Sequence, residues 1–284
     1  MRKIELTNKR LAWYKERANV KYWDTHWGEI SVYEVVESAR NSQFLSIFAR
    51  RLSPHYLILE AGCGLAQWVK VLDEKGFNIL GIDWSTCTIK RAKQCYPELK
   101  LLVGDVLDLP LRDNSLDCCI SLGVVEHFED GPERALKEAN RVLKPGGILF
   151  VSVPYFNPLR RVKAALGFYR EKMQNEPYDF YQYAFTVEEF SQILKKCGFI
   201  PLKIIPYDVL KGLKDEIFIV RKIYNKLKGE LSSQKCKYEH HRKNMNNAWS
   251  IRGLKSVFEK MFDLWIIRKI AAHMILFVAK VSKE

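Results

Sequence analysis

The stretch from Leu57 to Trp68, LILEAGCGLAQW, limits the folds open to this chain more than any other segment. Its start, Leu57 to Leu59, is typical of a strand buried on both faces, and Leu65 to Leu72 has the spacing of a helix. Between them, Gly62 and Gly64 permit backbone angles and a close ligand approach that a Cβ atom would block. Free N–H groups at the start of such a helix bind phosphates and carboxylates. The segment therefore predicts an α/β fold with a nucleotide-cofactor pocket at the end of the strand.

The spacing of the glycines separates two classes of cofactor. A dinucleotide fingerprint, G-x-G-x-x-G, would need glycine at Gln67, which is too bulky for that packing, so NAD is disfavoured. The residues present, Glu60-Ala-Gly62-Cys63-Gly64-Leu-Ala66, resemble instead the E/D-x-G-x-G-x-G turn of class I S-adenosylmethionine methyltransferases. Ala66 departs mildly from that pattern by replacing the last glycine. Taken alone, the turn is explained equally well as an ordinary strand-to-helix connection.

A second acidic residue stands at the end of the next expected strand. Asn78 to Ile82 is an apolar run, and Asp83 follows it, nineteen positions after Gly64. One carboxylate can accept hydrogen bonds from both hydroxyls of a ribose, and such a residue is expected about 20 positions after the glycines. The alternative is a purely structural turn, because Ser85 is a suitable N-cap for the helix that follows.

Three further strand ends extend the resemblance over residues 57–154. Leu99 to Val103 leads to Asp105 and Val106, which by resemblance accept from the adenine amino group and pack on the adenine ring. Cys118 to Leu122 exits through Gly123 and a Glu-His pair, and Ile148 to Val153 follows a glycine turn. The resemblance implies S-adenosyl-L-methionine as the cofactor, bound by Glu60, Gly62, Cys63, Gly64, Asp83, Trp84, Ser85, Asp105, Val106 and Leu122.

The resemblance also implies a Rossmann-like class I methyltransferase fold. This is a seven-stranded, mostly parallel sheet of strand order 3-2-1-4-5-7-6 with helices on both faces. We expect Phe199 to Ile205 as the sixth strand and Met274 to Val281 as the antiparallel seventh. The expected organisation is an N-terminal helical arm or lid at 1–52, a cofactor-binding core at 53–206 with an acceptor-side insert at 155–185, a basic helical insertion at 207–272 and the final strand at 273–284.

His127, at the exit of the fourth strand, is the candidate catalytic residue. A hydroxyl acceptor needs a base, and a histidine can fill that role. Two alternatives stay open: His127 only hydrogen-bonds its own helix, or Glu126 or Tyr155 orients the acceptor. The transfer is otherwise mainly a positioning problem, because the positive sulfur already activates the methyl group. The sequence has no cluster of carboxylates and histidines typical of a metal site, so no metal is expected.

Two segments rich in aromatic residues lie outside these motifs. Residues 13–27 include Trp23 and Trp27, and we expect this segment either to cover the cofactor or only to anchor the arm to the core. Residues 155–185 hold nine tyrosines and phenylalanines together with Arg160, Arg161 and Lys163. Their rings could enclose an acceptor while the cations hold an anionic group. The alternative is that the rings merely cover the edge of the sheet.

Helical spacing recurs in the arm and in the basic insertion. Val32 to Leu52 is expected to form a helix beside the sheet. Ile217 to Leu227 and Ile251 to Ile270 are expected as basic amphipathic helices, with a polar loop over Gly229 to Asn247 between them. Such helices either dock on their own core or lie in a membrane interface. No segment has the roughly 20 mostly apolar residues that a transmembrane helix needs.

The net charge of +13 belongs almost entirely to the second half of the chain. Residues 1–154 carry 21 Lys and Arg against 20 Asp and Glu, whereas residues 155–284 carry 25 against 13. This asymmetry suggests an anionic partner, such as a lipid headgroup, a phosphorylated precursor or RNA, the alternative being a solvated basic surface. The start of the chain lacks the apolar run of a signal peptide, so we expect a cytoplasmic protein. Peripheral membrane contact through the basic helices is the alternative to their docking on the core.

Three functions follow from these observations. The favoured one is methyl transfer to a small-molecule, lipid, quinone or sugar-type acceptor. The second is a tRNA or RNA methyltransferase, suggested by the basic half of the chain. The third is a cofactor-binding scaffold without transfer chemistry. The fourth strand ends in Ser121-Leu-Gly123 and not in an N-P-P-Y motif, which argues against adenine or glutamine acceptors.

Overall fold

The computed structural model describes residues 2–5, 10–171, 178–226 and 265–282. The chain divides into two compact units. The first comprises residues 1–154, 170–204 and 276–284, and the second comprises residues 155–169 and 205–275. All of the predicted cofactor motifs fall within the first unit.

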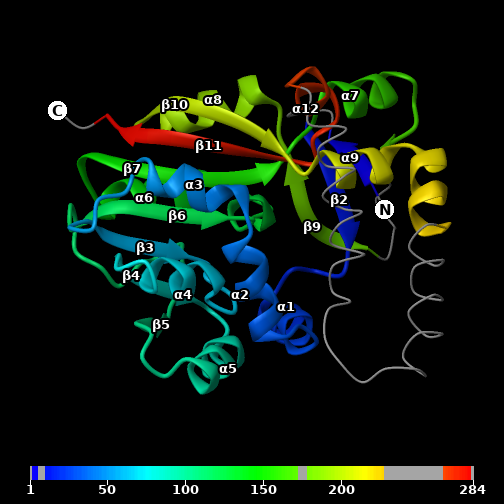
Figure 1. Cartoon of the computed structure of the whole chain (residues 1–284). Helices are drawn as coiled ribbons and strands as arrows, with labels where there is room; N and C mark the ends of the chain where they lie inside the picture. Colours follow the sequence, from blue (N-terminus) through cyan, green and yellow to red (C-terminus); the bar gives the residue numbers. More distant parts are fainter. Residues whose placement is uncertain (1, 6–9, 172–177, 227–264, 283–284) are drawn as a thin grey trace, which may run out of the picture. The chain divides into compact units, whose positions relative to one another are not determined.

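A seven-stranded sheet is the centre of the first unit (Figure 1). Its strands are β3 (Leu57–Ala61), β4 (Asn78–Asp83), β5 (Leu101–Val103), β6 (Leu116–Leu122), β7 (Leu143–Pro154), β10 (Phe199–Tyr207) and β11 (Met274–Val281). They lie in the order β10-β11-β7-β6-β3-β4-β5. When these seven strands alone are numbered along the chain, the order is 3-2-1-4-5-7-6, so the predicted fold is confirmed.

The directions of the strands also agree with the prediction. β3 pairs in parallel with β4 and β6, β4 pairs in parallel with β5, and β6 pairs in parallel with β7. The last strand, β11, runs the other way (Figure 1). The N–H of Ser282, just after β11, donates to the carbonyl of Gly198, just before β10, at 2.9 Å. The carboxyl ends of the parallel strands therefore meet at one edge of the sheet, where the predicted site residues stand.

Helices cover both faces of this sheet. Phe150 of β7 contacts Phe48 of α3 (Gln43–Ala49), with ring centroids 4.9 Å apart. The neighbouring Leu149 lies with Leu136 and Ala139 of α6 (Glu133–Val142) around a small apolar cavity. Adjacent residues of a strand point to opposite faces, so α3 and α6 lie on opposite sides of the sheet. The remaining helices around this sheet are α2 (Val32–Arg40), α4 (Gln67–Asp73), α5 (Thr86–Cys95) and α8 (Val187–Lys196).

The N-terminal arm differs from the predicted helical segment. A second sheet, of order β8-β1-β2-β9, contains β1 (Arg2–Glu5), β2 (Arg10–Lys15), β8 (Arg170–Glu171) and β9 (Asp179–Ala184). β2 pairs antiparallel with β1 and with β9. Only after these strands does the arm become helical, in α1 (Val20–Gly28). The prediction was wrong for residues 2–5 and 10–15, because β2 is stabilised by a strand about 170 positions away.

The single helix predicted from Val32 to Leu52 was also wrong. The chain leaves the helical conformation after Arg40 and begins α3 at Gln43. The hydroxyl of Ser42 accepts from the N–H of Phe44, and the amide of Asn41 donates to the carbonyl of Glu37. Such side chains compete with the helical backbone for its hydrogen bonds, which ends one helix and caps the next.

The second unit is built around a buried ion pair. Its elements are α7 (Pro158–Ala165), α9 (Val209–Glu216), a helical segment at 218–226 and α12 (Trp265–Ala271). Arg160 is fully buried, and its guanidinium donates to Glu216 at 2.9 Å and to the carbonyl of Tyr155 at 2.7 Å. Lys163 also donates to Glu216, at 2.9 Å. Neither cation is free for an acceptor, which corrects the anion-holding role predicted for them.

Two other expectations concern the basic insertion. The helix expected at 217–227 is confirmed over 218–226. The polar loop expected over Gly229 to Asn247 and most of the helix expected over Ile251 to Ile270 lie outside the described residues. Within the described parts of the chain, no helix is both long and apolar enough to cross a bilayer.

Candidate functional site

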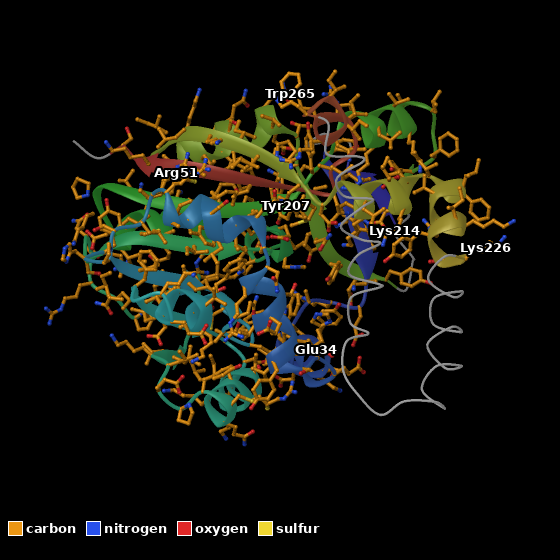
Figure 2. All side chains as sticks on the ribbon, in the orientation of Figure 1. Glu34, Arg51, Tyr207, Lys214, Lys226 and Trp265 are labelled. Atoms are coloured by element: carbon orange, nitrogen blue, oxygen red, sulfur yellow. The ribbon has the colours of Figure 1, made fainter. Side chains whose placement is uncertain are left out.

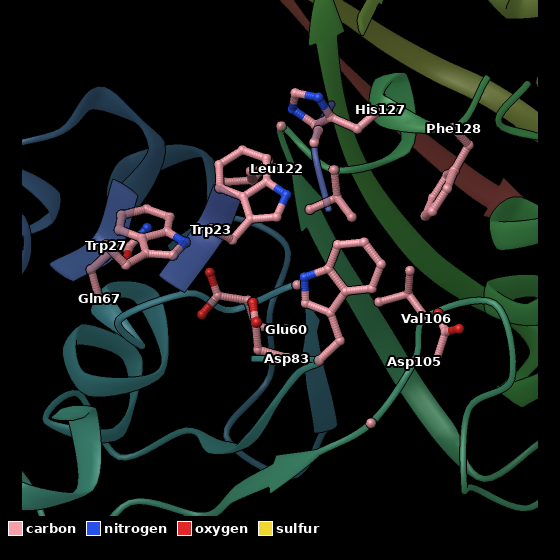
Figure 3. A pocket seen from close by; sticks show the side chains of 16 residues that line it. Trp23, Trp27, Glu60, Gln67, Asp83, Asp105, Val106, Leu122, His127 and Phe128 are labelled. Carbon is pink, nitrogen blue, oxygen red and sulfur yellow. The ribbon is translucent and has the colours of Figure 1, made fainter. Parts of the chain in front are cut away.

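A cavity opens at the carboxyl ends of the parallel strands (Figure 3). Its empty volume is about 760 Å³, part of which is open to solvent. Of the predicted cofactor residues, those in its lining are Glu60, Gly62, Asp83, Trp84, Asp105, Val106 and Leu122. His127 lines it as well. Cys63, Gly64 and Ser85 stand beside it in the sequence but not in its lining.

The glycine turn after β3 has the left-handed backbone that its sequence allows. Gly62 has φ +77°, and a Cβ atom added there would lie 2.5 Å from Cγ2 of Val124. Gly64 has φ +52°, and a Cβ atom there would lie 2.8 Å from the ring of Trp27. Ala66, at the position where the family pattern has its last glycine, also has a left-handed backbone, with φ +59°. The turn thus needs glycine twice and tolerates alanine under strain once.

The carboxylate of Asp83 connects this turn to the next helix. Its Oδ2 accepts from the N–H of Gly64 at 2.9 Å, and its Oδ1 accepts from the N–H of Ser85 at 3.0 Å. The hydroxyl of Ser85 in turn caps α5 by accepting from the N–H of Thr88. The capped turn considered as an alternative is therefore present. It does not exclude ligand binding, because each carboxylate oxygen keeps a second lone pair and Asp83 faces the cavity.

Burial changes the acidity of both carboxyl groups below the turn. Glu60 is 2% exposed, and its Oε2 accepts from the N–H of Val69 at 3.1 Å. Desolvation raises the pKa of Glu60 well above its ordinary value, and the nearby Asp83 raises it further. Burial also raises the pKa of Asp83. A bound cation such as a sulfonium or an ammonium group would favour the charged forms of both residues.

The surroundings of His127 determine which of its ring nitrogens carries the hydrogen. It belongs to η1 (Val125–His127), a short 3₁₀ helix after β6, and its Nδ1 lies 2.7 Å from the carbonyl oxygen of Tyr181. A carbonyl only accepts, so Nδ1 carries the hydrogen and Nε2 keeps its lone pair. Burial lowers the pKa of His127 to about 4. The ring is therefore neutral near pH 7, with one nitrogen able to accept a hydrogen bond.

Glu126, beside it, is buried without full hydrogen bonding. The side chain is 2% exposed, and its Oε2 has no hydrogen-bond partner among the residues that the structure describes. Desolvation raises the pKa of Glu126 to about 8, so the carboxyl group is mostly protonated at neutral pH. It does not line the cavity, and it faces Gly123, which does.

Several lining residues were not assigned to the cofactor site from the sequence. They include Gln67, Val124 and Phe128, together with Trp23 and Trp27 of α1 (Figure 3). Trp23 and Trp27 are four positions apart, and this spacing indicates that both rings lie on the same face of α1. The rings of Trp23 and Trp27 line the cavity, and Trp27 also packs on the glycine turn. The role of the arm as a lid over the cofactor stays a prediction. In the described part of the chain, no group of three or more His, Cys, Asp or Glu side chains could hold a metal.

The comparison with known protein families agrees with this geometry. Residues 59–151, which run from β3 to β7 and contain most of the cavity lining, match the family model of the methyltransferase domain. Over these residues the chain is similar to methyltransferase domains. This match supports the resemblance drawn from the glycine turn and the strand ends.

Individual relatives match the methyltransferase domain and differ elsewhere. A probable S-adenosylmethionine-dependent methyltransferase of Mycolicibacterium smegmatis is 29% identical over 142 residues, covering 50% of this chain and 51% of its own. Probable tRNA methyltransferase 9B of Bos taurus is 37% identical over 110 residues, covering 37% of this chain and 23% of its own. The chain thus spans about half or less of the length of these relatives. A Thermotoga maritima methyltransferase shares the fold, with TM-score 0.52, 20% identity and coverage of 93% and 100%.

S-adenosylmethionine is the cofactor of this domain family, and the residues present fit it. Gly62 lines the cavity, and its left-handed backbone with φ +77° brings the main chain to the cavity wall without a side chain. Asp83 can accept from a ribose, and Asp105 and Val106 stand together on the cavity wall where the resemblance places adenine. The buried Oε1 of Gln67 has no hydrogen-bond partner among the described residues, so a polar acceptor also faces this region.

Proposed function

We propose that the methyltransferase domain transfers the methyl group of S-adenosylmethionine to a small-molecule, lipid, quinone or sugar-type acceptor. The observation that carries this proposal is the neutral His127 at the cavity, with Nδ1 bonded to the carbonyl of Tyr181 and Nε2 unprotonated. Such a nitrogen can accept the proton of a hydroxyl group as its oxygen attacks.

The proposed mechanism asks the protein mainly to position its two substrates. S-adenosylmethionine supplies a methyl group already activated by the positive sulfur. Asp83 and the glycine turn hold the donor, and His127 and Trp23 contact the acceptor side of the cavity. Bound there, S-adenosylmethionine would supply the methyl group to the oxygen of the acceptor and leave as S-adenosylhomocysteine, and Nε2 of His127 would take the proton that the hydroxyl loses. Alignment of the reacting atoms supplies most of the acceleration, because it removes the entropy cost of their encounter.

A tRNA or RNA acceptor is the second candidate. The 37% identity to probable tRNA methyltransferase 9B and the excess of basic residues after position 154 favour it. Binding to bulk tRNA would then weaken steeply with salt, because phosphate contacts release counterions. A cavity walled by tryptophans and a buried histidine favours instead a compact acceptor. A cytoplasmic location and peripheral membrane contact through the basic segment stay predictions.

Calorimetric titration and a transfer assay test the proposal together. S-adenosylhomocysteine is titrated into the wild type, Asp83→Ala and Lys75→Ala, the last being a matched change at an exposed position. We expect Asp83→Ala to bind at least tenfold more weakly and Lys75→Ala to bind like the wild type. An acceptor screen with labelled S-adenosylmethionine then compares the wild type with His127→Asn.

Each outcome distinguishes one function from another. Turnover of a small molecule that falls at least a hundredfold in His127→Asn, with donor affinity retained, supports the proposal. Turnover of tRNA alone supports the second candidate. Binding of S-adenosylhomocysteine with no turnover on any acceptor supports the scaffold, and unchanged affinity in Asp83→Ala contradicts the donor site itself.

A further inference from the structure

Four rings form a closed circuit beside the cofactor cavity. Tyr22 contacts Trp23 with centroids 5.1 Å apart, Trp23 contacts His127 at 5.0 Å, His127 contacts Tyr181 at 4.9 Å, and Tyr181 contacts Tyr22 at 5.6 Å. Two members of this ring circuit, Trp23 and His127, also line the cavity, and Figure 3 shows them next to each other. Tyr22, Trp23 and Tyr181 are half-buried. The circuit therefore continues the wall of the cavity outward from the proposed base.

A single cation stands over the outer side of this ring circuit. Nζ of Lys15, the last residue of β2, lies 3.6 Å from the ring centroid of Tyr181 and 4.9 Å from that of Tyr22. It donates to the hydroxyl of Tyr22 at 2.7 Å. Lys15 has no carboxylate partner among the residues that the structure describes. The positive charge of Lys15 also acts on the proposed base, because Lys15 is one of the groups that lower the pKa of His127.

The charges around the ring circuit favour one class of ligand. Flat apolar groups stack on aromatic rings, and an ammonium group without a carboxylate partner attracts an anion. A cationic acceptor would meet a like charge at Lys15. The hydroxyl of Tyr181, which accepts from the hydroxyl of Tyr22 at 3.5 Å, keeps its own hydrogen as a donor that suits an anionic oxygen. Arg160 and Lys163, which the sequence suggested for an anionic group, are both bound to Glu216.

We propose that Lys15 and the ring circuit are the acceptor subsite, and that the acceptor is a flat hydroxyl compound bearing a carboxylate or a similar anionic group. The hydroxyl group faces Nε2 of His127 and the anionic group pairs with Lys15. Both His127 and Lys15 contact the same ring, that of Tyr181, so a single small molecule spans them. The inference rests on the proposed methyl transfer and specifies its substrate class.

Three phenols that differ in charge provide the test. 4-Hydroxyphenylacetate, 4-hydroxyphenylacetamide and tyramine are titrated into protein saturated with S-adenosylhomocysteine, with binding followed by saturation-transfer NMR. We expect the acid to bind about fivefold more tightly than the amide, as for an ion pair with an exposed lysine, and tyramine to bind most weakly. Lys15→Met should abolish the preference for the acid, and Lys15→Arg should keep it. Lys21→Met is the matched control, because Lys21 is an exposed lysine on the same arm.

The outcomes separate this inference from the proposed function. Equal binding of acid and amide, tighter binding of tyramine, an unchanged preference in Lys15→Met, or no binding of any of the three phenols would overturn the subsite. Affinity for S-adenosylhomocysteine is measured on every variant and should stay at the wild-type value, which shows that each variant is folded. A preference for the acid without turnover on any acceptor leaves the subsite standing and removes the proposed function.

Discussion

Replacement of Gly62 by alanine tests the geometry of the donor site most directly. The added Cβ atom would lie 2.5 Å from Cγ2 and 3.1 Å from Cγ1 of Val124, in a backbone with φ +77°. Gly76 offers a matched control, because its φ is +81° and a Cβ atom there would have no heavy atom within 4 Å. The two substitutions share the backbone strain, and only the first adds a steric clash.

The expected magnitudes follow from these two contributions. A left-handed backbone costs a non-glycine residue about 1–2 kcal/mol, which sets the loss expected for Gly76→Ala. Overpacking against Val124 adds about 1–3 kcal/mol, so Gly62→Ala should lose about 2–5 kcal/mol of unfolding free energy. Because Val124→Ala removes both clashing carbons, the double variant Gly62→Ala/Val124→Ala should show a favourable coupling of about 1–3 kcal/mol.

Urea unfolding of the wild type and the four variants measures these energies. S-adenosylhomocysteine titration of the same proteins should show weaker binding for Gly62→Ala and wild-type binding for Gly76→Ala, because only Gly62 lines the cavity. Equal losses of stability at the two glycines, or strictly additive effects of Gly62→Ala and Val124→Ala, would refute the reasoning.

Three further predictions concern strain, burial and charge. Ala66→Gly should raise the unfolding free energy by up to about 1 kcal/mol, because glycine relieves the φ of +59°, and a loss of stability in urea would contradict this. The folded protein keeps the proton of Glu126 up to a pKa of about 8, whereas the unfolded chain releases it near 4.5, so this group destabilises the fold by about 1.4 kcal/mol per pH unit between those values. Glu126→Gln should therefore gain stability relative to the wild type from pH 5 to pH 8, and a constant difference would be inconsistent with a buried neutral carboxyl. Arg160→Met should lose up to about 3–5 kcal/mol, because it removes the guanidinium from the buried carboxylate of Glu216 and leaves that carboxylate with Lys163 and Tyr169. Arg160→Met/Glu216→Leu should recover much of that loss in thermal unfolding, and a loss below about 1 kcal/mol for the single variant would contradict the role of the ion pair.

The sequence was most informative where the structure depends on neighbouring residues. A buried parallel strand, a glycine turn and a helix start follow one another within about a dozen positions, so the ends of β3 and β4 could be placed with Glu60 and Asp83. The strand order came from the resemblance that these motifs carry. The position of β11, which is far along the chain, was readable because its apolar run is uninterrupted from Met274 to Ala279.

The errors arose where a residue depends on a distant partner. The strand from Arg10 to Lys15 forms by pairing with β9, and no local sequence pattern predicts that pairing. Arg160 was predicted to hold an anionic group of the acceptor, yet it is fully buried and its guanidinium donates to Glu216, 56 positions later. The contribution of α1 to the cavity wall depends in the same way on contacts between the arm and the sheet.

The ring circuit is made of residues from the arm, from the turn after β6 and from β9. The residues proposed to bind the methyl donor come instead from the strand ends of the sheet. In the proposed assignment, the contacts to the acceptor and the contacts to the methyl donor therefore come from largely separate parts of the chain. Exchange of the arm and β9 between proteins of this fold should therefore change the acceptor while the proposed donor-binding residues stay unchanged.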